Sequence, residues 1–154
     1  MDVAATFISL ADTYGIDREK LKIEITESSI LSRRVKESHV IDRLADAVFN
    51  LEIDDFGKGY SSLNTLKDIN ARTLKLDMAF FQMTDKDKKR GEVIIESVIQ
   101  MGKRLGMHIV AEGVETVRER DYLIHLGRDY LQGYLFSWPV SVEEFERHVT
   151  GNLV

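Results

Sequence analysis

Two adjacent carboxylates, Asp54 and Asp55, stand where a predicted strand ends and a glycine-containing loop begins. Residues 49–53 alternate between apolar and polar side chains, which is the period of a strand, and Gly57 and Gly59 then end the regular backbone. Two carboxylates at one strand end repel each other, and a cation beside them offsets that repulsion. The pair is therefore a candidate metal site, although an isolated Asp-Asp pair is more often a solvated acidic turn.

Four other predicted strands also carry polar side chains near their ends. Alternation predicts these strands at 21–26, 73–77, 107–112 and 130–134, and each carries a charged or amide side chain near its C-terminal end. The candidate site residues are Glu24, Asp54, Asp55, Lys75, Glu112 and Gln132. A (β/α)8 barrel and an open doubly wound sheet both bind ligands at this edge, so geometry alone leaves both folds open.

Helical segments separate these strands. Apolar spacing predicts helices over 1–14, 38–47 and 91–105, and Thr116 and Ser141 each precede a glutamate by three positions, as in a capping box. Strands that alternate with helices are typical of βα units around a parallel sheet. Carboxylates at the strand ends could bind Mg2+ or Mn2+, and such a metal activates water against a phosphodiester.

Five motifs resemble, in order, those of the EAL family, the bacterial cyclic-di-GMP phosphodiesterases. They occupy residues 21–28, 54–63, 74–77, 111–116 and 132–135, and the second of them reads DDFGKGYSSL. The resemblance covers the chain from about 21 to 139 and implies a (β/α)8 TIM-type barrel, of which roughly five C-terminal βα units are present. The family's Glu-Ala-Leu motif and the strand with its Asn metal ligand are absent. We therefore expect residues 1–154 to form a single truncated EAL domain.

The resemblance also implies an activity and a set of roles. Cyclic di-GMP would be hydrolysed to linear pGpG at a two-metal site that holds Mg2+ or Mn2+. The implied metal ligands are Glu24, Asp54, Asp55 and Glu112. The implied catalytic residues are Lys75, which would hold the attacking water, Gln132 near that water, and Glu112 and Asp54. The implied residues of the substrate and its loop are Glu27, Asp77, Phe56, Gly57, Ser61, Ser62 and Glu115.

Several of these residues have a structural alternative. Lys75 could be a surface lysine with a snorkelling stem, Gln132 could hydrogen-bond inside the barrel, and Glu115 could complete the turn before the next helix. Trp138 is expected to pack at the end of the barrel rather than to stack on a base. The alternative function is a non-catalytic module that binds cyclic di-GMP or serves in dimerisation and signalling. Because the Glu-Ala-Leu glutamate and the Asn ligand are absent, we expect this chain alone to be inactive or impaired.

Strand parity adds a prediction about the interior. Residues two or four positions before the site residues face the same side, among them Lys22, Glu52, Thr73, His108 and Tyr130. An unpaired buried charge is costly, so we predict that Lys22 and Glu52 pair across neighbouring strands. The EAL pattern usually has a small or apolar residue in the place of Glu52, so this pair departs from the family. His108 is expected to be a satisfied interior histidine rather than a metal ligand.

Composition narrows the class of function. The chain has 154 residues, no cysteine and a net charge of −5. The absence of cysteine excludes a thiolate metal site and fits a reducing compartment, so we expect a cytoplasmic protein. The acidic balance argues against a binder of nucleic-acid polymers, and no apolar run approaches the ~18–20 residues of a membrane span. The expected partners are cyclic di-GMP, a second copy in a homodimer or other oligomer, and an upstream sensor or GGDEF domain in a longer parent protein.

Overall fold

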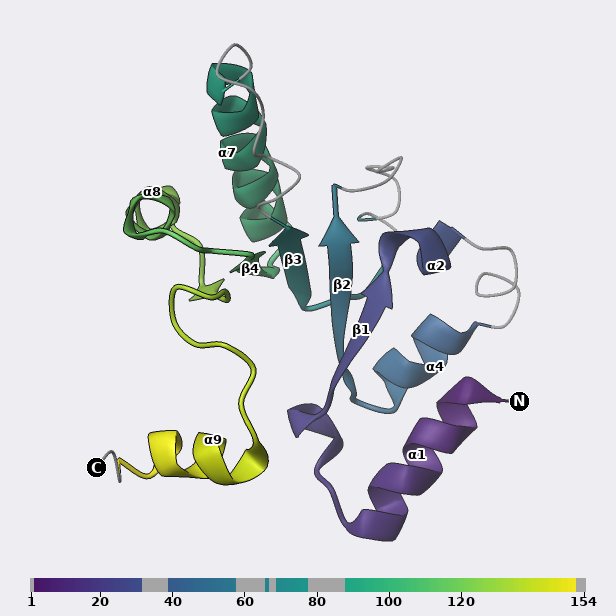
Figure 1. Ribbon diagram of the computed structural model, residues 1–154. Helices are drawn as coiled ribbons and strands as arrows, with labels where there is room; N and C mark the ends of the chain where they lie inside the picture. The colour runs from purple at the N-terminus through teal and green to yellow at the C-terminus, as the bar shows by residue number, and fades with distance from the viewer. Residues whose placement is uncertain (1, 32–38, 58–65, 67–68, 78–87, 152–154) are drawn as a thin grey trace.

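The computed structural model describes residues 2–31, 39–57, 66, 69–77 and 88–151. Its five strands are parallel and follow chain order in one sheet, β1-β2-β3-β4-β5 (Figure 1). The strands are β1 Lys22–Thr26, β2 Asn50–Phe56, β3 Thr73–Asp77, β4 His108–Glu112 and β5 Tyr130–Leu131. The helices are α1 Val3–Tyr14, the 3-10 turn η1 Arg18–Lys20, α2 Glu27–Leu31, α4 Val40–Asp46, α7 Lys88–Arg104, α8 Val117–Leu126 and α9 Val142–Val149. The predicted alternation of strands and helices is confirmed.

The last strand is shorter than its sequence predicts. After Leu131 the chain turns at Gly133 and runs against the backbone of Val114, whose carbonyl oxygen would lie 2.2 Å from a Cβ atom at Gly133. The amide of Leu135 then donates to that same carbonyl at 3.0 Å. The predicted strand over 130–134 is therefore correct only for its first two residues.

Alternate strand residues pack beneath the helices. Leu74 and Leu76 of β3 and Ile109 of β4 are fully buried, in one apolar cluster with Ile99 of α7 and Leu123 of α8. A second cluster joins β1 and β2 to α1 and α4, which lie beside those strands in Figure 1. Because side chains alternate along a strand, the residues between these apolar positions face the other side of the sheet.

The sheet curves so strongly that side chains of its two edge strands meet. Three strands separate β1 from β5, so a flat sheet with a spacing of about 4.8 Å would hold them roughly 19 Å apart. Nevertheless Lys22 Nζ of β1 lies 5.8 Å from the ring centroid of Tyr130 on β5. The Tyr130 ring also meets His108 of β4 edge-on, with the centroids 6.1 Å apart. The concave side is thus the interior of a partial (β/α)8 barrel.

The helix ends carry the predicted caps. Thr116 Oγ1 accepts from the Glu119 amide at 3.2 Å, and the Glu119 carboxylate accepts from the Thr116 amide at 3.0 Å, so this capping box is confirmed. Ser141 Oγ accepts from the Glu144 amide at 3.3 Å. Helix α7 starts at Lys88, three residues before the predicted start at Gly91. Within the described ranges, no helix combines the length and hydropathy that a membrane crossing requires.

Candidate functional site

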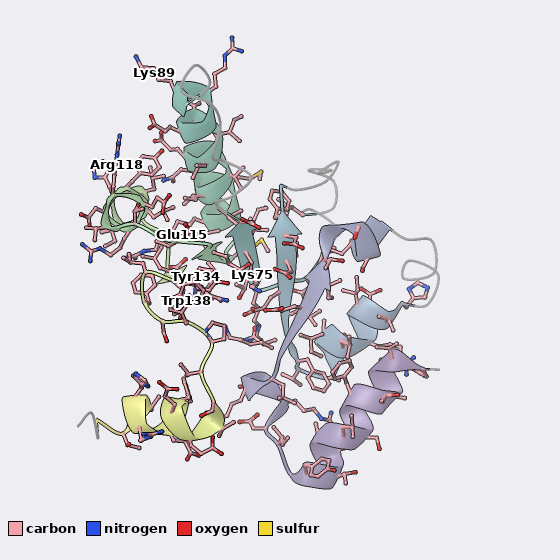
Figure 2. The ribbon with its side chains drawn as sticks, in the orientation of Figure 1. Lys75, Lys89, Glu115, Arg118, Tyr134 and Trp138 are labelled. Carbon is pink, nitrogen blue, oxygen red and sulfur yellow. The ribbon has the colours of Figure 1, made fainter. Side chains whose placement is uncertain are left out.

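Three of the predicted site carboxylates converge on Lys75, which Figure 2 labels. Its side chain is only 7% exposed, and Nζ donates a hydrogen bond to Glu24 of β1. The same Nζ lies 3.2 Å from Asp54 Oδ1 of β2 and 3.0 Å from Glu112 Oε1 of β4. The alternative of an exposed surface lysine is therefore wrong, and one ammonium joins carboxylates from three other strands.

Register and parity explain this convergence. Lys75 lies on β3, between the strands that carry Asp54 and Glu112, and its register partner on β4 is Val110. On β1, Thr26 is the register partner of Asp54, so Glu24 stands one pleat lower and reaches upward to the ammonium. All four site side chains have the parity of the concave side, as the sequence predicts.

A β-bulge in β2 includes the two adjacent aspartates, so this strand does not end in regular pairing. Ile53 pairs with Leu74 and Phe56 with Leu76, so β2 uses one more residue than β3 over this stretch. Asp55 takes up the extra length with φ of 56°, in the left-handed region that aspartate tolerates better than most residues. Bulges re-aim side chains and are frequent beside active sites. The sequence gives the aspartates but does not show this backbone change.

The cluster carries an excess of negative charge. Three carboxylates against one ammonium leave a formal charge of −2. Burial lowers the pKa of Lys75, but hydrogen bonds to Glu24, Glu112 and Asp54 outweigh it and raise that pKa above its ordinary value. Burial raises the pKa of Glu112, Lys75 opposes the shift, and the charges of Asp54 and Glu24 add to it. A further cation would stabilise the ionised carboxylates.

The donor set fits a divalent metal in charge and in ligand type. Carboxylate oxygens are the ligands that Mg2+ and Mn2+ prefer. Asp54 Oδ1 is a buried oxygen whose charged neighbour among the described residues is Lys75 Nζ, at 3.2 Å. Lys75 Nζ stands at the point of convergence, and the described residues hold no group of three or more His, Asp or Glu side chains already arranged around a metal. Lys75 therefore occupies the position at which a metal would meet one oxygen of each of the three carboxylates.

Asp77 and Gln132 border the cluster through their strands. Asp77 ends β3 as the register partner of Glu112. The Gln132 amide donates to the Ala111 carbonyl at 2.9 Å, and its own carbonyl accepts from the Val114 amide at 3.1 Å. The structure thus fastens the chain at Gln132 to both sides of Glu112, while the Gln132 side chain is exposed.

The remaining predicted residues lie next to the site in the chain or outside the residues that the structure describes. The Glu115 amide donates to the Glu119 carboxylate at 3.0 Å, which favours its role in the turn before α8 (Figure 2). Phe56 is buried among the apolar core residues, and Gly57 follows it with φ of 102°, a left-handed value that favours glycine. Glu27 opens α2. Outside the described residues lie the Glu27 side chain, Ser61 and Ser62.

The structure also tests the predictions about the Lys22–Glu52 pair and about Trp138. Lys22 Nζ lies 2.8 Å from Glu52 Oε1, which confirms the predicted pair. Trp138 does not pack at the barrel's end, because its side chain is 66% exposed and stacks on Tyr134 with ring centroids 3.9 Å apart (Figure 2). Sequence reasoning missed this contact, because Tyr134 and Trp138 lie in an irregular segment between β5 and α9, where spacing along the chain does not indicate which side chains meet.

The model of the EAL domain family matches residues 2–139. The chain belongs to the EAL domain family. Among curated relatives, the cyclic di-GMP phosphodiesterase PdeL of Escherichia coli K12 is 33% identical over 90% of this chain, and RocR of Pseudomonas aeruginosa is 33% identical over 97%. The signaling protein YkoW of Bacillus subtilis is 35% identical over 88% of this chain. This EAL domain spans 38% of PdeL, 38% of RocR and 17% of YkoW.

Solved structures resemble the fold over nearly the whole chain. The EAL domain of Mycobacterium smegmatis DcpA superposes with a TM-score of 0.84 and 30% identity, over 98% of this chain and 67% of that one. The c-di-GMP complex of the PaMucR phosphodiesterase gives a TM-score of 0.82 and 31% identity, over 93% and 57%. A manganese/cy-diGMP complex of Klebsiella pneumoniae BlrP1 gives a TM-score of 0.79 and 32% identity, over 90% and 35%.

Proposed function

We propose that this EAL domain hydrolyses cyclic di-GMP to linear pGpG with the help of Mg2+ or Mn2+. The observation that carries the proposal is the convergence of Glu24, Asp54 and Glu112 on Lys75 at the C-terminal side of four adjacent strands. PdeL and RocR, each named a cyclic di-GMP phosphodiesterase, and the manganese/cy-diGMP complex of BlrP1 support it. Since the chain spans 38% of PdeL and of RocR, the activity of a whole protein is part of the proposal.

The carboxylates would hold the metals in this reaction. Glu24, Asp54 and Glu112 would bind one ion, and Asp55 would bind a second. When bound, the metals supply a water of lowered pKa and offset charge on the phosphodiester. Asp77, beside Glu112 on the next strand, would support these ligands.

Lys75 would act as a fixed cation rather than as a base. Its pKa is raised, so its amine stays protonated at neutral pH and donates hydrogen bonds. A buried ammonium that is already in place stabilises the negative charge that develops during attack. It would orient the oxygen of the water, with Gln132 near the same oxygen. The water oxygen would form a new P–O bond while one P–O3′ bond of the ring breaks; one proton of the water would end on the 3′ oxygen, and the other would stay with the new 5′ phosphate or pass to solvent.

A module that binds cyclic di-GMP without cutting it is the second candidate. Lys75 Nζ fills the point where the carboxylates converge, and no ready-made group of metal ligands exists among the described side chains. An ammonium in this place could meet a phosphate of the dinucleotide directly. Such a module would bind the ligand without a metal.

Turnover and binding, measured together, separate the two candidates. The purified chain is incubated with cyclic di-GMP and Mn2+ or Mg2+, beside Asp54→Asn and the control Asp17→Asn, whose side chain is 55% exposed on the surface. Formation of pGpG that Asp54→Asn abolishes and Asp17→Asn preserves supports the phosphodiesterase. Binding without turnover supports the second candidate, and the absence of both rejects the two proposals.

We further propose that other strands close this partial barrel. The outer edges of β1 and β5 have no strand partner within the described ranges. A second copy of the chain or a further segment of a longer parent protein would supply these strands. The relatives MucR, named a bifunctional diguanylate cyclase/cyclic di-GMP phosphodiesterase, and DosP, named an oxygen sensor protein, support an additional cyclase or sensor domain. Sedimentation of the purified chain tests the homo-oligomer, which a monomer at all concentrations would reject.

A further inference from the structure

A second ion pair lies beneath the Lys75 cluster, on the same concave face. Glu52 precedes Asp54 by two residues on β2, and its side chain is only 4% exposed. Lys22 precedes Glu24 by two residues on β1, and its Nζ lies 2.8 Å from Glu52 Oε1. Because Glu52 Oε1 is buried, its attraction to the Lys22 ammonium is little screened by water.

Lys22 has two carboxylates within reach. Glu24 and Glu52 are register partners on β1 and β2, so their carboxylates stand side by side on the concave face. Residues two apart on one strand are about 6.7 Å apart, which a lysine side chain can span, so the ammonium of Lys22 could also reach Glu24. In the structure it goes to Glu52, and the carboxylate of Glu24 is taken by Lys75.

Burial explains this choice. The Glu24 side chain is 51% exposed and can be hydrated, whereas Glu52 is almost wholly enclosed. A buried carboxylate without a counter-charge is strongly destabilising, so the ammonium of Lys22 stabilises the protein more beside Glu52 than beside Glu24. The Tyr130 ring, 5.8 Å from Lys22 Nζ, favours the same position through its π face.

We propose that Glu52 is a positioning residue that holds Lys22 in the lower layer and so keeps Glu24 available to a divalent cation. The inference rests on the proposed function, because it concerns the metal that Glu24 would bind there. If the charge of Glu52 is removed, Lys22 turns to the neighbouring carboxylate of Glu24. A second ammonium on Glu24 then competes with the metal, in addition to Lys75.

The experiment compares Mn2+ binding to the purified chain by calorimetry and by the EPR signal of free Mn2+. The variants are E52Q, which keeps the shape of the side chain, and the double variant K22M/E52Q, which also removes the competing ammonium. The control is D17N, which removes a carboxylate from the exposed Lys20–Asp17 pair. Circular dichroism checks that each variant keeps its fold.

We expect E52Q to weaken Mn2+ binding about 10-fold, the lower end of the usual effect of residues that support metal ligands. K22M/E52Q should restore the affinity of the unaltered chain, and D17N should leave it unchanged. A loss in E52Q that K22M/E52Q does not restore would show a merely structural role and overturn the inference, as would unchanged affinity in E52Q. If the unaltered chain binds no Mn2+, the metal-dependent function and the inference both fail, whereas binding that is indifferent to E52Q removes the inference alone.

Discussion

Replacement of Lys75 by methionine removes the one cation among three carboxylates while it keeps the length of the side chain. At an effective dielectric constant of about 20, each contact near 3 Å attracts by roughly 5 kcal/mol, but desolvation of the ammonium offsets much of the sum. Removal of one partner from a buried ion pair costs about 3–5 kcal/mol. Since Glu24 is 51% exposed and partly screened, we expect Lys75→Met to lower the free energy of unfolding by about 3 kcal/mol.

Urea unfolding, followed by circular dichroism, measures this loss beside Lys20→Met. Lys20 is 81% exposed and lies 4.0 Å from Asp17, so its replacement should cost less than about 0.5 kcal/mol.

The pH dependence has a definite sign. Burial raises the pKa of Glu112 and Lys75 opposes this shift, so removal of Lys75 should raise that pKa further. A group with a raised pKa stabilises the fold at low pH and loses this contribution as pH rises, so the penalty of Lys75→Met should shrink on acidification, as Glu112 takes up a proton. A loss no larger than that of Lys20→Met, or one that grows on acidification, would refute the reasoning.

Three further predictions concern the frame of the site. Gly133→Ala should destabilise the fold by about 3 kcal/mol or more in urea unfolding, because its Cβ would lie 2.2 Å from the Val114 carbonyl oxygen; a loss below about 1 kcal/mol would contradict this close approach. Burial, with the charges of nearby glutamates, raises the pKa of Tyr122, so the fold should lose stability as pH rises above about 10. Tyr122→Phe should remove that part of the loss, and equal loss of stability at high pH in the variant and the unaltered chain would contradict this. Thr116→Ala should cost about 1 kcal/mol by thermal unfolding, since the α8 capping box is lost, and an unchanged melting temperature would count against the cap.

Parity along the strands was enough to predict much of the site. The period of two placed Glu24, Asp54, Lys75 and Glu112 on one face, and the structure brings these four side chains together. The same parity, with the cost of a buried charge, led to the pair of Lys22 and Glu52. Such predictions succeed because they depend on local backbone geometry and on a strong energetic penalty.

Features set by neighbouring backbone could not be predicted in the same way. The left-handed conformation of Asp55 depends on how β2 pairs with β3, and a single strand does not reveal its partner's register. The early end of β5 follows from the approach of Val114 to Gly133, which are far apart in sequence. The curvature that brings Lys22 to Tyr130 is likewise a property of the whole sheet.

Hydrolysis of cyclic di-GMP in isotopically labelled water tests the central claim most directly. At protein concentrations at which a second copy closes the barrel, the purified chain with Mn2+ should convert the cyclic dinucleotide to linear pGpG that carries one labelled oxygen on its 5′ phosphate. Asp54→Asn should give no product under the same conditions. Product that forms equally with Asp54→Asn, or no product from the unaltered chain at high protein and metal concentration, would contradict the claim that the cluster around Lys75 is a hydrolytic centre.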